Sequence, residues 1–241
     1  MSDKKLTGKI AKENIKQLST PKVENGLLES FRHLGDASGV LSDVMDQLGI
    51  TGVVGASVLR PTISNAVSVG VALTVRNVIQ RDHVYETAKN KVNQMAEFEA
   101  HNLAQKDDFI VIQGVSGISN MGGISAQTGK RQGEVGAIVE GGIRDVAHSR
   151  AIGYPVWSTE ITPVTGKWRI QTVEINGVVQ ICGVRVNCGD IVFADSSGVC
   201  FIPRARAQEV LKLAQQVVKA EKIKCEAIDA GVAVPDLPKN A

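Results

Sequence analysis

Residues 109–158 read FIVIQGVSGISNMGGISAQTGKRQGEVGAIVEGGIRDVAHSRAIGYPVWS, and this stretch decides the fold. Short apolar runs in it predict three buried strands, at 109–113, 136–140 and 155–158. The residues between these runs predict helices over 126–132 and from about 144 to 152. Strands that alternate with helices are typical of a parallel sheet with right-handed crossovers. The stretch therefore predicts an α/β fold with a parallel βαβαβ core.

The chain before this core predicts further helices and strands. The segment SGVLSDVMDQLG (38–49) carries apolar residues at helical spacing and predicts an amphipathic helix that ends at Gly49. Two β-branched runs predict strands at 53–59 and 68–75, and residues 81–105 predict one long helix.

The chain after the core predicts added hairpins and a last helix. WRIQTVEI and VVQICGVRV flank Asn176-Gly177, which is a strong hairpin signal. A second strand pair is predicted at 190–195 and 198–203, and an amphipathic helix at 204–223. We expect one α/β domain over 26–220, with a basic arm or helix at 1–25 before it and a helix end and tail at 221–241 after it.

The composition excludes several classes of protein. The 241 residues are 43% hydrophobic and 22% charged, which is typical of a globular domain and not of a disordered, collagen-like or coiled-coil chain. With 27 Lys+Arg against 25 Asp+Glu, the net charge of +2 favours neither a nucleic-acid nor an anionic-membrane partner. No stretch approaches the roughly 18 apolar residues of a membrane span.

The four cysteines match neither a CxxC redox motif nor paired zinc knuckles, and no secretory apolar run precedes them. We therefore expect a cytoplasmic chain with reduced thiols.

Two glycine-rich loops follow neighbouring predicted strands, at 114–125 and 141–145. The carboxyl ends of parallel strands are where open α/β sheets place a ligand crevice. Gly122 and Gly123 allow close approach of a ligand to the backbone, and the N–H groups of Gly123, Ile124 and Ser125 would open a helix and attract an anion. A tight turn that needs glycine would explain the Gly-Gly pair equally well.

The second loop adds two charged residues, Arg144 and Asp145. The guanidinium of Arg144 can hold a carboxylate in bidentate fashion, and Asp145 is the kind of oxygen ligand that holds Mg²⁺ together with water and substrate. The alternative is a first-turn acid that interacts with the helix dipole while the arginine faces solvent.

An ordered series of motifs resembles the RraA-like family, which includes the magnesium-dependent 4-hydroxy-4-methyl-2-oxoglutarate/4-carboxy-4-hydroxy-2-oxoadipate aldolases. The series comprises SDVMDQLG at 42–49, GVALTV at 70–75, GGIRD at 141–145, AIGYPV at 151–156 and GD…AD..GV within 189–199. It covers about residues 38–210.

This resemblance implies an α/β fold assembled as homotrimers or homohexamers, with active sites between subunits. It implies that Arg144 binds the pyruvyl part of a small oxo acid, that Asp145 holds Mg²⁺ or another divalent metal such as Mn²⁺, and that the amides of the glycine loop, residues 122–125, complete the pocket. The implied reaction is pyruvate-releasing cleavage of 4-hydroxy-2-oxo acids, with Arg144 and Asp145 as catalytic residues and oxaloacetate decarboxylation as a companion activity.

The chain departs from the aldolase pattern D-x20-R-D, because Gly123 stands where the pattern has an acid. Glu140 is a candidate replacement carboxylate, although strand alternation can also direct it away. The departure keeps open the alternative of a non-catalytic RraA-like regulator that binds a ribonuclease or helicase partner.

Other chemistry has less support in the sequence. Lys130 and Lys167 lie in polar stretches and favour surface positions over a Schiff base, and the histidines have no zinc spacing. His148 follows Arg144 by one helical turn and either borders the pocket or faces solvent.

Overall fold

Residues 4–239 are described by the computed structural model, and residues 1–3 and 240–241 of the predicted arm and tail lie outside the described part. Ten strands form one mixed sheet: β1 (Val53–Gly55), β2 (Arg60–Pro61), β3 (Ser68–Ile79), β4 (Asp108–Gln113), β5 (Ser119–Met121), β6 (Gly136–Ile143), β7 (Val156–Ile161), β8 (Ile170–Ile175), β11 (Ile191–Ala194) and β12 (Gly198–Ile202). The order along the main path is β1-β12-β11-β3-β4-β6-β7-β2, while β5 pairs with β6 and β8 with β3. A separate two-stranded sheet joins β9 (Val179–Ile181) to β10 (Val184–Val186).

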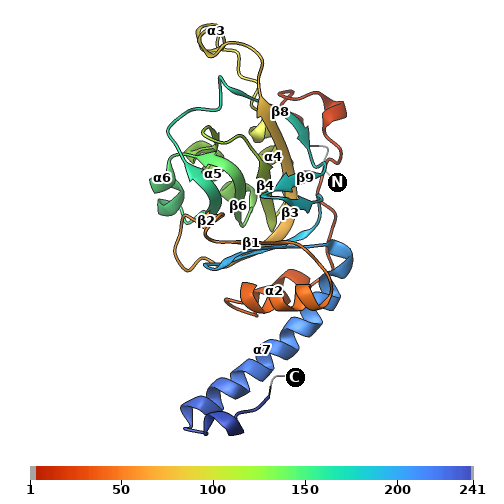
Figure 1. The fold of residues 1–241 in the computed structure, drawn as a ribbon. Coiled ribbons are helices and arrows are strands. Elements are labelled where there is room, and N and C mark those ends of the chain that lie inside the picture. The colour runs from red at the N-terminus through yellow and green to blue at the C-terminus, as the bar shows by residue number, and fades with distance from the viewer. Residues whose placement is uncertain (1–3, 240–241) are drawn as a thin grey trace.

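Seven α-helices accompany the sheets in residues 4–239: α1 (Leu27–Arg32), α2 (Ser38–Gln47), α3 (Val84–Lys89), α4 (Glu97–Leu103), α5 (Gly123–Gln132), α6 (Val146–Ala151) and α7 (Ala207–Asp229). Three short 3-10 helices are η1 (Lys12–Asn14), η2 (Arg204–Arg206) and η3 (Val234–Asp236). Helices α4, α5 and α6 lie together against the main sheet, whereas α2 and α7 lie at the other end of the protein (Figure 1).

The predicted parallel βαβαβ core is confirmed. Strands β3, β4, β6 and β7 are neighbours, and each adjacent pair is parallel. Phe109, Ile110, Val111 and Ile112 are fully buried, as expected for a strand covered on both faces. The loops after β4 and β6 therefore leave the sheet at the same edge.

The core divides into layers on either side of this sheet. Alternate residues of β4 and β6, such as Ile110 and Val139, pack under α4 and α5, and the intervening residues pack with Trp157 and the β9–β10 sheet. A third cluster joins α1, α2 and α7 to β3, β11 and β12. The predicted antiparallel strand pair near the C-terminus is confirmed as β11 and β12.

The prediction of one long helix over 81–105 is wrong. Helix α3 ends at Lys89, and α4 begins at Glu97. Lys91 takes a left-handed conformation with φ 55°, and the side chain of Asn93 accepts a hydrogen bond from the Met95 N–H. The Asn93 side chain thus takes a backbone N–H that a continuous helix would use, and the segment divides into two helices.

The predicted hairpin at Asn176-Gly177 is also wrong. Strand β8 pairs with β3, and β9 turns back at Cys182-Gly183 to pair with β10. Asn176 does take a left-handed conformation, but its side-chain amide donates to the Gln17 carbonyl and its backbone N–H to the Thr74 carbonyl. The chain does turn at Asn176, but these hydrogen bonds hold the turn against β3. Strand β9 therefore pairs with β10 and not with β8.

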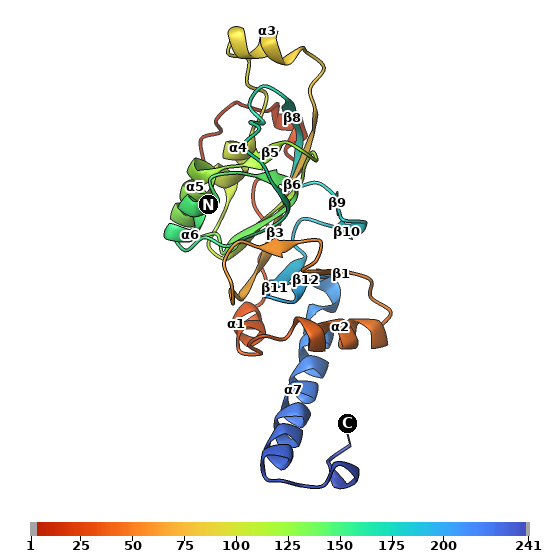
Figure 2. The same ribbon diagram turned by 60° about the vertical axis from the view of Figure 1, so that its left-hand side comes forward.

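The two ends of the chain differ in how they pack. The N-terminal arm is mostly extended, and Ile15 is buried where it bridges to Ile175 of β8. Helix α7 runs past the predicted end at 223, to Asp229, and extends away from the rest of the protein (Figure 2). Within residues 4–239 no helix is both long and apolar enough to cross a membrane. The domain boundaries at residues 25 and 220 stay a prediction.

Candidate active site

Strand β5 brings the two glycine-rich loops together at the carboxyl edge of the parallel strands. It pairs with the end of β6, where Met121 lies opposite Ile143, and the Arg144 N–H donates to the Met121 carbonyl at 3.1 Å. The next residues are therefore neighbours in space: the N-terminus of α5 on one side, and Arg144 and Asp145 on the other. Figure 1 shows α5 and α6 side by side there.

Asp145 is the centre of this arrangement. Its Oδ2 accepts the Gly123 N–H at 3.0 Å and lies 3.5 Å from Nε of Arg144. Its backbone is left-handed, with φ 57°, a conformation that few residues other than glycine, asparagine and aspartate adopt. About half of the Asp145 side chain and a third of the Arg144 side chain are exposed, so both charges are open to solvent at this edge of the sheet, the site predicted above as a crevice.

A side chain at Gly122 would press on the Arg144 and Asp145 side chains. A Cβ there would lie 3.0 Å from Oδ2 of Asp145 and 3.2 Å from Nε of Arg144. The glycine therefore lets the backbone approach the Arg144–Asp145 pair, which is more than a tight turn requires.

Gly123 is crowded in a different way. A Cβ at this position would lie 3.1 Å from Cβ of Asp145 and 3.2 Å from Cδ2 of His148. His148 is exposed on α6, and its ring borders the position at which the aldolase pattern has an acid. An acid at 123 would need this ring to move by a few tenths of an ångström.

Ile124 and Ser125 belong to the first turn of α5; the Ile124 side chain faces solvent and the Ser125 side chain faces the interior. The Ile124 side chain is 73% exposed, whereas Ser125 is buried and donates its hydroxyl to Glu97 of α4 at 3.3 Å. Helix geometry leaves first-turn N–H groups without partners inside the helix, so the backbone here can meet an anion. The predicted site residues thus come together, and their roles in binding and catalysis stay predictions.

Glu140 does not join the crevice. It follows Ile138 by two residues on β6 and so lies on the sheet face opposite α5. Burial and the nearby charge of Glu140 raise the pKa of the Cys182 thiol to about 11, which places the carboxylate near the β9–β10 sheet.

Two residues that the sequence analysis did not single out hold the loop after β4. Asn120 is buried; its Oδ1 accepts the Val115 N–H at 3.0 Å, and its amide donates to the carbonyls of Val115 and Ile118. Glu160 of β7 accepts from the Ser116 hydroxyl and the Gly117 N–H, both at 2.6 Å. In the sequence, Asn120 stands out only as a polar residue beside apolar ones in the glycine-rich loop, which does not predict its hydrogen bonds.

Among the residues predicted for the site, Asp145 is the one carboxylate that could hold a divalent metal. No group of three or more His, Cys, Asp or Glu residues in the part of the chain that the structure describes could hold a metal. A site that rests on Asp145 alone leaves the other positions to water and substrate, which Mg²⁺ accepts and structural Zn²⁺ does not.

The lysines weighed for Schiff-base chemistry lie elsewhere. Lys130 is near the far end of α5 and bonds to the Ile152 carbonyl. It lines a hollow of about 590 Å³ with Arg32, Glu134 and Tyr154, at the end of the strands opposite the Arg144–Asp145 crevice. Lys167 is exposed in the loop before β8.

A sequence model of the RraA-like family, described as Aldolase/RraA, matches residues 38–201. The chain belongs to the RraA-like family. It is 31% identical over 174 residues to protein DlpA of Legionella pneumophila, a match that covers 72% of this chain and only 27% of DlpA. It is 27% identical over 194 residues, 80% of this chain and 84% of the relative, to a Halalkalibacterium halodurans protein named "Putative 4-hydroxy-4-methyl-2-oxoglutarate aldolase".

Solved structures support the same fold. An uncharacterized protein from Pseudomonas syringae pv. tomato superposes on the RraA-like chain with a TM-score of 0.74 and 24% identity, covering 90% of this chain and 94% of that protein. The predicted α/β fold class and the family resemblance are both confirmed.

Proposed function

We propose that this RraA-like chain is a magnesium-dependent, class II lyase that releases pyruvate from 4-hydroxy-2-oxo acids and also decarboxylates oxaloacetate. The observation that carries the proposal is the Asp145 carboxylate, which the Gly123 amide holds beside the Arg144 guanidinium in an open crevice. Two opposite charges and a helix N-terminus that converge on one strand-end crevice are typical of a site for an anionic substrate.

Binding and orientation would come from Arg144 and the first turn of α5. The guanidinium of Arg144 pairs with the substrate carboxylate, and the backbone N–H groups of Ile124 and Ser125 face the same anion. Cleavage passes the proton of the C4 hydroxyl to a base, turns C4–O into a carbonyl as the bond between C3 and C4 breaks, and leaves the electron pair on the enolate of pyruvate. A proton taken up at C3 then gives pyruvate. The positive charge of Arg144 stabilises that enolate.

Asp145 would hold the metal. Mg²⁺, or Mn²⁺ in its place, supplies Lewis-acid stabilisation of the enolate when bound. Asp145 keeps its side chain directed at the crevice through the Gly123 N–H, so this amide positions the metal ligand and does not bind substrate.

Oxaloacetate and the hydroxy acids differ in one useful respect. Decarboxylation needs the same enolate stabilisation but no base for a C4 hydroxyl. Since Gly123 supplies no acid, comparison of the two substrate types measures whether another group acts as the base.

The test is a coupled assay of pyruvate release from a panel of 4-hydroxy-2-oxo acids and from oxaloacetate, with Mg²⁺ and with a chelator. We expect release with Mg²⁺ by the wild type, and a loss of at least about 100-fold with chelator and in Asp145→Ala. Asp82→Ala, which changes an exposed acid outside the crevice, is the matched control and should keep full activity. Turnover of oxaloacetate alone would identify a decarboxylase without a C4 base.

Absence of turnover for every substrate would overturn the lyase. The alternative is then the non-catalytic regulator, and capture of a ribonuclease or helicase by the wild-type chain would test it.

We further propose a homotrimer or homohexamer whose subunits meet near the crevice. Ile124 and Ile161 are 73% and 68% exposed at this edge, and large exposed apolar side chains are typical of protein interfaces. Light scattering of the wild type against Ile161→Glu measures the assembly. A monomer at all concentrations would contradict it.

A further inference from the structure

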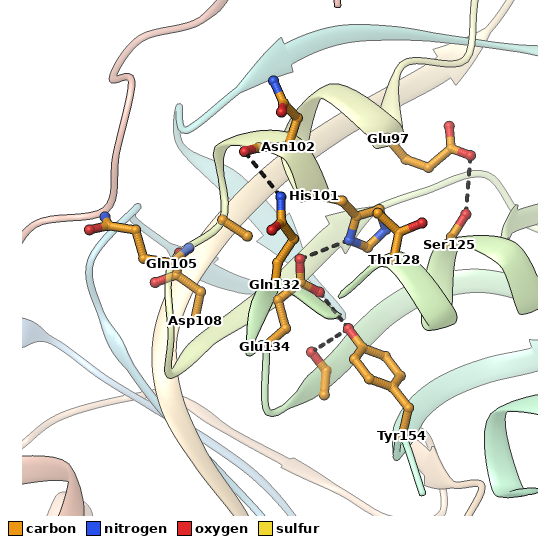
Figure 3. Close-up of polar contacts among 12 residues, drawn as sticks. Glu97, His101, Asn102, Gln105, Asp108, Ser125, Thr128, Gln132, Glu134 and Tyr154 are labelled. Carbon is orange, nitrogen blue, oxygen red and sulfur yellow. Dashed lines mark hydrogen bonds and ion pairs between the residues drawn. The ribbon is translucent and has the colours of Figure 1, made fainter. Parts of the chain in front are cut away.

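A buried polar cluster lies between α4 and α5 and reaches from the first turn of α5 to the far end of that helix (Figure 3). Glu134 and His101 are both fully buried, and Oε1 of Glu134 lies 2.8 Å from Nδ1 of His101. The hydroxyl of Tyr154 donates to Oε2 of Glu134 at 2.6 Å. At the other end of the cluster, Glu97 accepts the Ser125 hydroxyl through Oε1.

Two atoms of this cluster have no hydrogen-bond partner among the described residues: Nε2 of His101 and Oε2 of Glu97. Buried polar atoms are nearly always paired, so two orphans in one cluster call for an explanation. The two residues are four apart on α4 and therefore lie on the same face of the helix. A protonated Nε2 is a donor and an ionised Oε2 is an acceptor, so the two orphans are complementary.

We propose that Glu97 and His101 share one buried proton through a bridging water molecule, and that Glu97 is thereby a positioning residue for the first turn of α5. In one state His101 is an imidazolium and Glu97 a carboxylate. In the other, the proton has moved from Nε2 to Oε2; His101 is then neutral and still donates Nδ1–H to Glu134, and Glu97 is a carboxylic acid. No other atom changes its proton between the two states.

The surroundings of the cluster raise the pKa of both residues that would share the proton. Burial disfavours the imidazolium, but the charge and hydrogen bond of Glu134 outweigh it and raise the pKa of His101. Burial also raises the pKa of Glu97, and its own backbone N–H, His101 and Ser125 offset only part of this. The other ionisable groups that act on the pair are Glu134, which faces His101, and Lys9 of the arm, whose charge acts on Glu97. Tyr154 and Asp108 of β4 act in turn on Glu134.

The shared proton links the cluster to the crevice. An ionised Glu97 is a negative charge behind the positive end of α5, where it competes with an anion in front of it. A bound oxo acid therefore favours the neutral carboxylic acid and shifts the proton to Glu97. This last step rests on the proposed function, because it needs an anion at the first turn of α5; the proton sharing itself does not.

The experiment is NMR of the full chain labelled with ¹⁵N-histidine and ¹⁵N-amides, with pyruvate as the probe. Of the four histidines, His101 is assigned by the loss of its signals in His101→Gln. We expect protonation at Nε2 in the free wild type, and a shift of Nε2 toward the deprotonated form when pyruvate is added. Glu97→Gln should remove the response to pyruvate and move the amide signals of residues 123–125.

Glu99→Gln is the matched control. Glu99 is a second buried glutamate of α4, but it accepts from the Thr7 and Gly8 amides of the N-terminal arm and not from α5. It should leave the His101 and first-turn signals unchanged. Ser125→Ala keeps Glu97 and His101 but removes the hydroxyl that joins Glu97 to α5. The His101 signals should therefore respond as in the wild type, while the amide signals of residues 123–125 should no longer change with them. This variant also decides the matter if Glu97→Gln does not fold.

A His101 that stays neutral with a bare Nε2 at every pH, and does so equally in wild type and Glu97→Gln, would overturn the proposal. The lyase assay distinguishes this failure from that of the proposed function. In an active enzyme, Glu97→Gln should lower KM about two- to fivefold, with little change in kcat, because it removes the negative charge that competes with the bound anion. In an inactive chain, the NMR of the free protein still supports or overturns proton sharing.

Discussion

The two ends of helix α5 hold charge in opposite ways. At its start, Arg144 and Asp145 are partly exposed, and backbone groups hold them in place. Near its other end, the side chains of Glu134 and His101 are fully buried, and their hydrogen bonds are to other side chains. Charges in water contribute little to folding and remain available to a ligand, whereas a buried charge is costly once a partner is removed. The crevice should therefore govern activity, and the buried cluster stability.

The largest expected effect is on folding. Glu134→Ala leaves the buried Nδ1 of His101 without its charged acceptor, which should lower the free energy of unfolding by about 3–5 kcal/mol; the Tyr154 hydroxyl keeps the Gly136 carbonyl as an acceptor at 3.1 Å. Glu134→Gln keeps an acceptor and should cost less. Urea denaturation of both variants measures the difference, and equal losses below about 1 kcal/mol would break the contrast between the two regions.

The next effect is on activity. Gly122→Ala places a Cβ 3.0 Å from Oδ2 of Asp145, so the Arg144–Asp145 pair must move. A displacement of this kind should reduce pyruvate release by about 10- to 100-fold. Gly39→Ala also replaces a glycine, but in α2, in open space and without a positive φ, and should keep wild-type turnover. Full activity in Gly122→Ala would show that the close approach is not needed.

A related variant restores the acid of the aldolase pattern. Gly123→Asp meets Asp145 and His148, so its activity should improve when His148→Ala is added. A double variant no more active than Gly123→Asp alone would show that His148 does not limit an acid at this position.

The pH dependence of stability tests the buried region. Burial raises the pKa of Asp108 to about 6, because bonds from the Gln105 N–H and the Thr20 hydroxyl offset only part of the desolvation. The folded state then binds more protons than the unfolded state between the ordinary pKa near 3.8 and about 6. Stability should therefore fall as pH rises through this window, by at most about 1.4 kcal/mol per pH unit. Between pH 4 and 7, the free energy of unfolding should depend less steeply on pH in Asp108→Asn than in the wild type. An equal dependence would show that Asp108 does not contribute to it.

The smallest expected effect is the stability of a crevice variant. Asp145→Gly relieves the left-handed strain at φ 57° but loses the acceptor for the Gly123 N–H. The two terms nearly cancel, so the free energy of unfolding should change by less than about 1 kcal/mol while activity is lost. A large loss of stability would show that the crevice is part of the folding core.

The sequence predicted what depends on local pattern. Unbroken apolar runs gave β4, β6 and β7, and the loops after such strands indicated Arg144 and Asp145. The partner of a strand depends on contacts that are distant in the sequence. Asn176-Gly177 therefore predicted the turn correctly, but the predicted pairing of the strands on either side of it was wrong. The members of the buried cluster come from α4, from α5 and from the loops before β6 and β7, so no single local pattern brings them together. Only the spacing of Glu97 and His101 hinted that they share a face.

Helix α7 has a consequence for local unfolding. Its buried residues are Ala207, Val210, Leu211 and Ala214, and none of its residues after Ala214 is buried. In a single chain, the last four turns are therefore held by helical hydrogen bonds with little tertiary packing, and an isolated helix of that length is marginal in water. Their amides should exchange with deuterium far faster than those of 207–214, so the exchange rate along α7 reports where the folding unit ends and whether another surface covers the helix in the assembled protein.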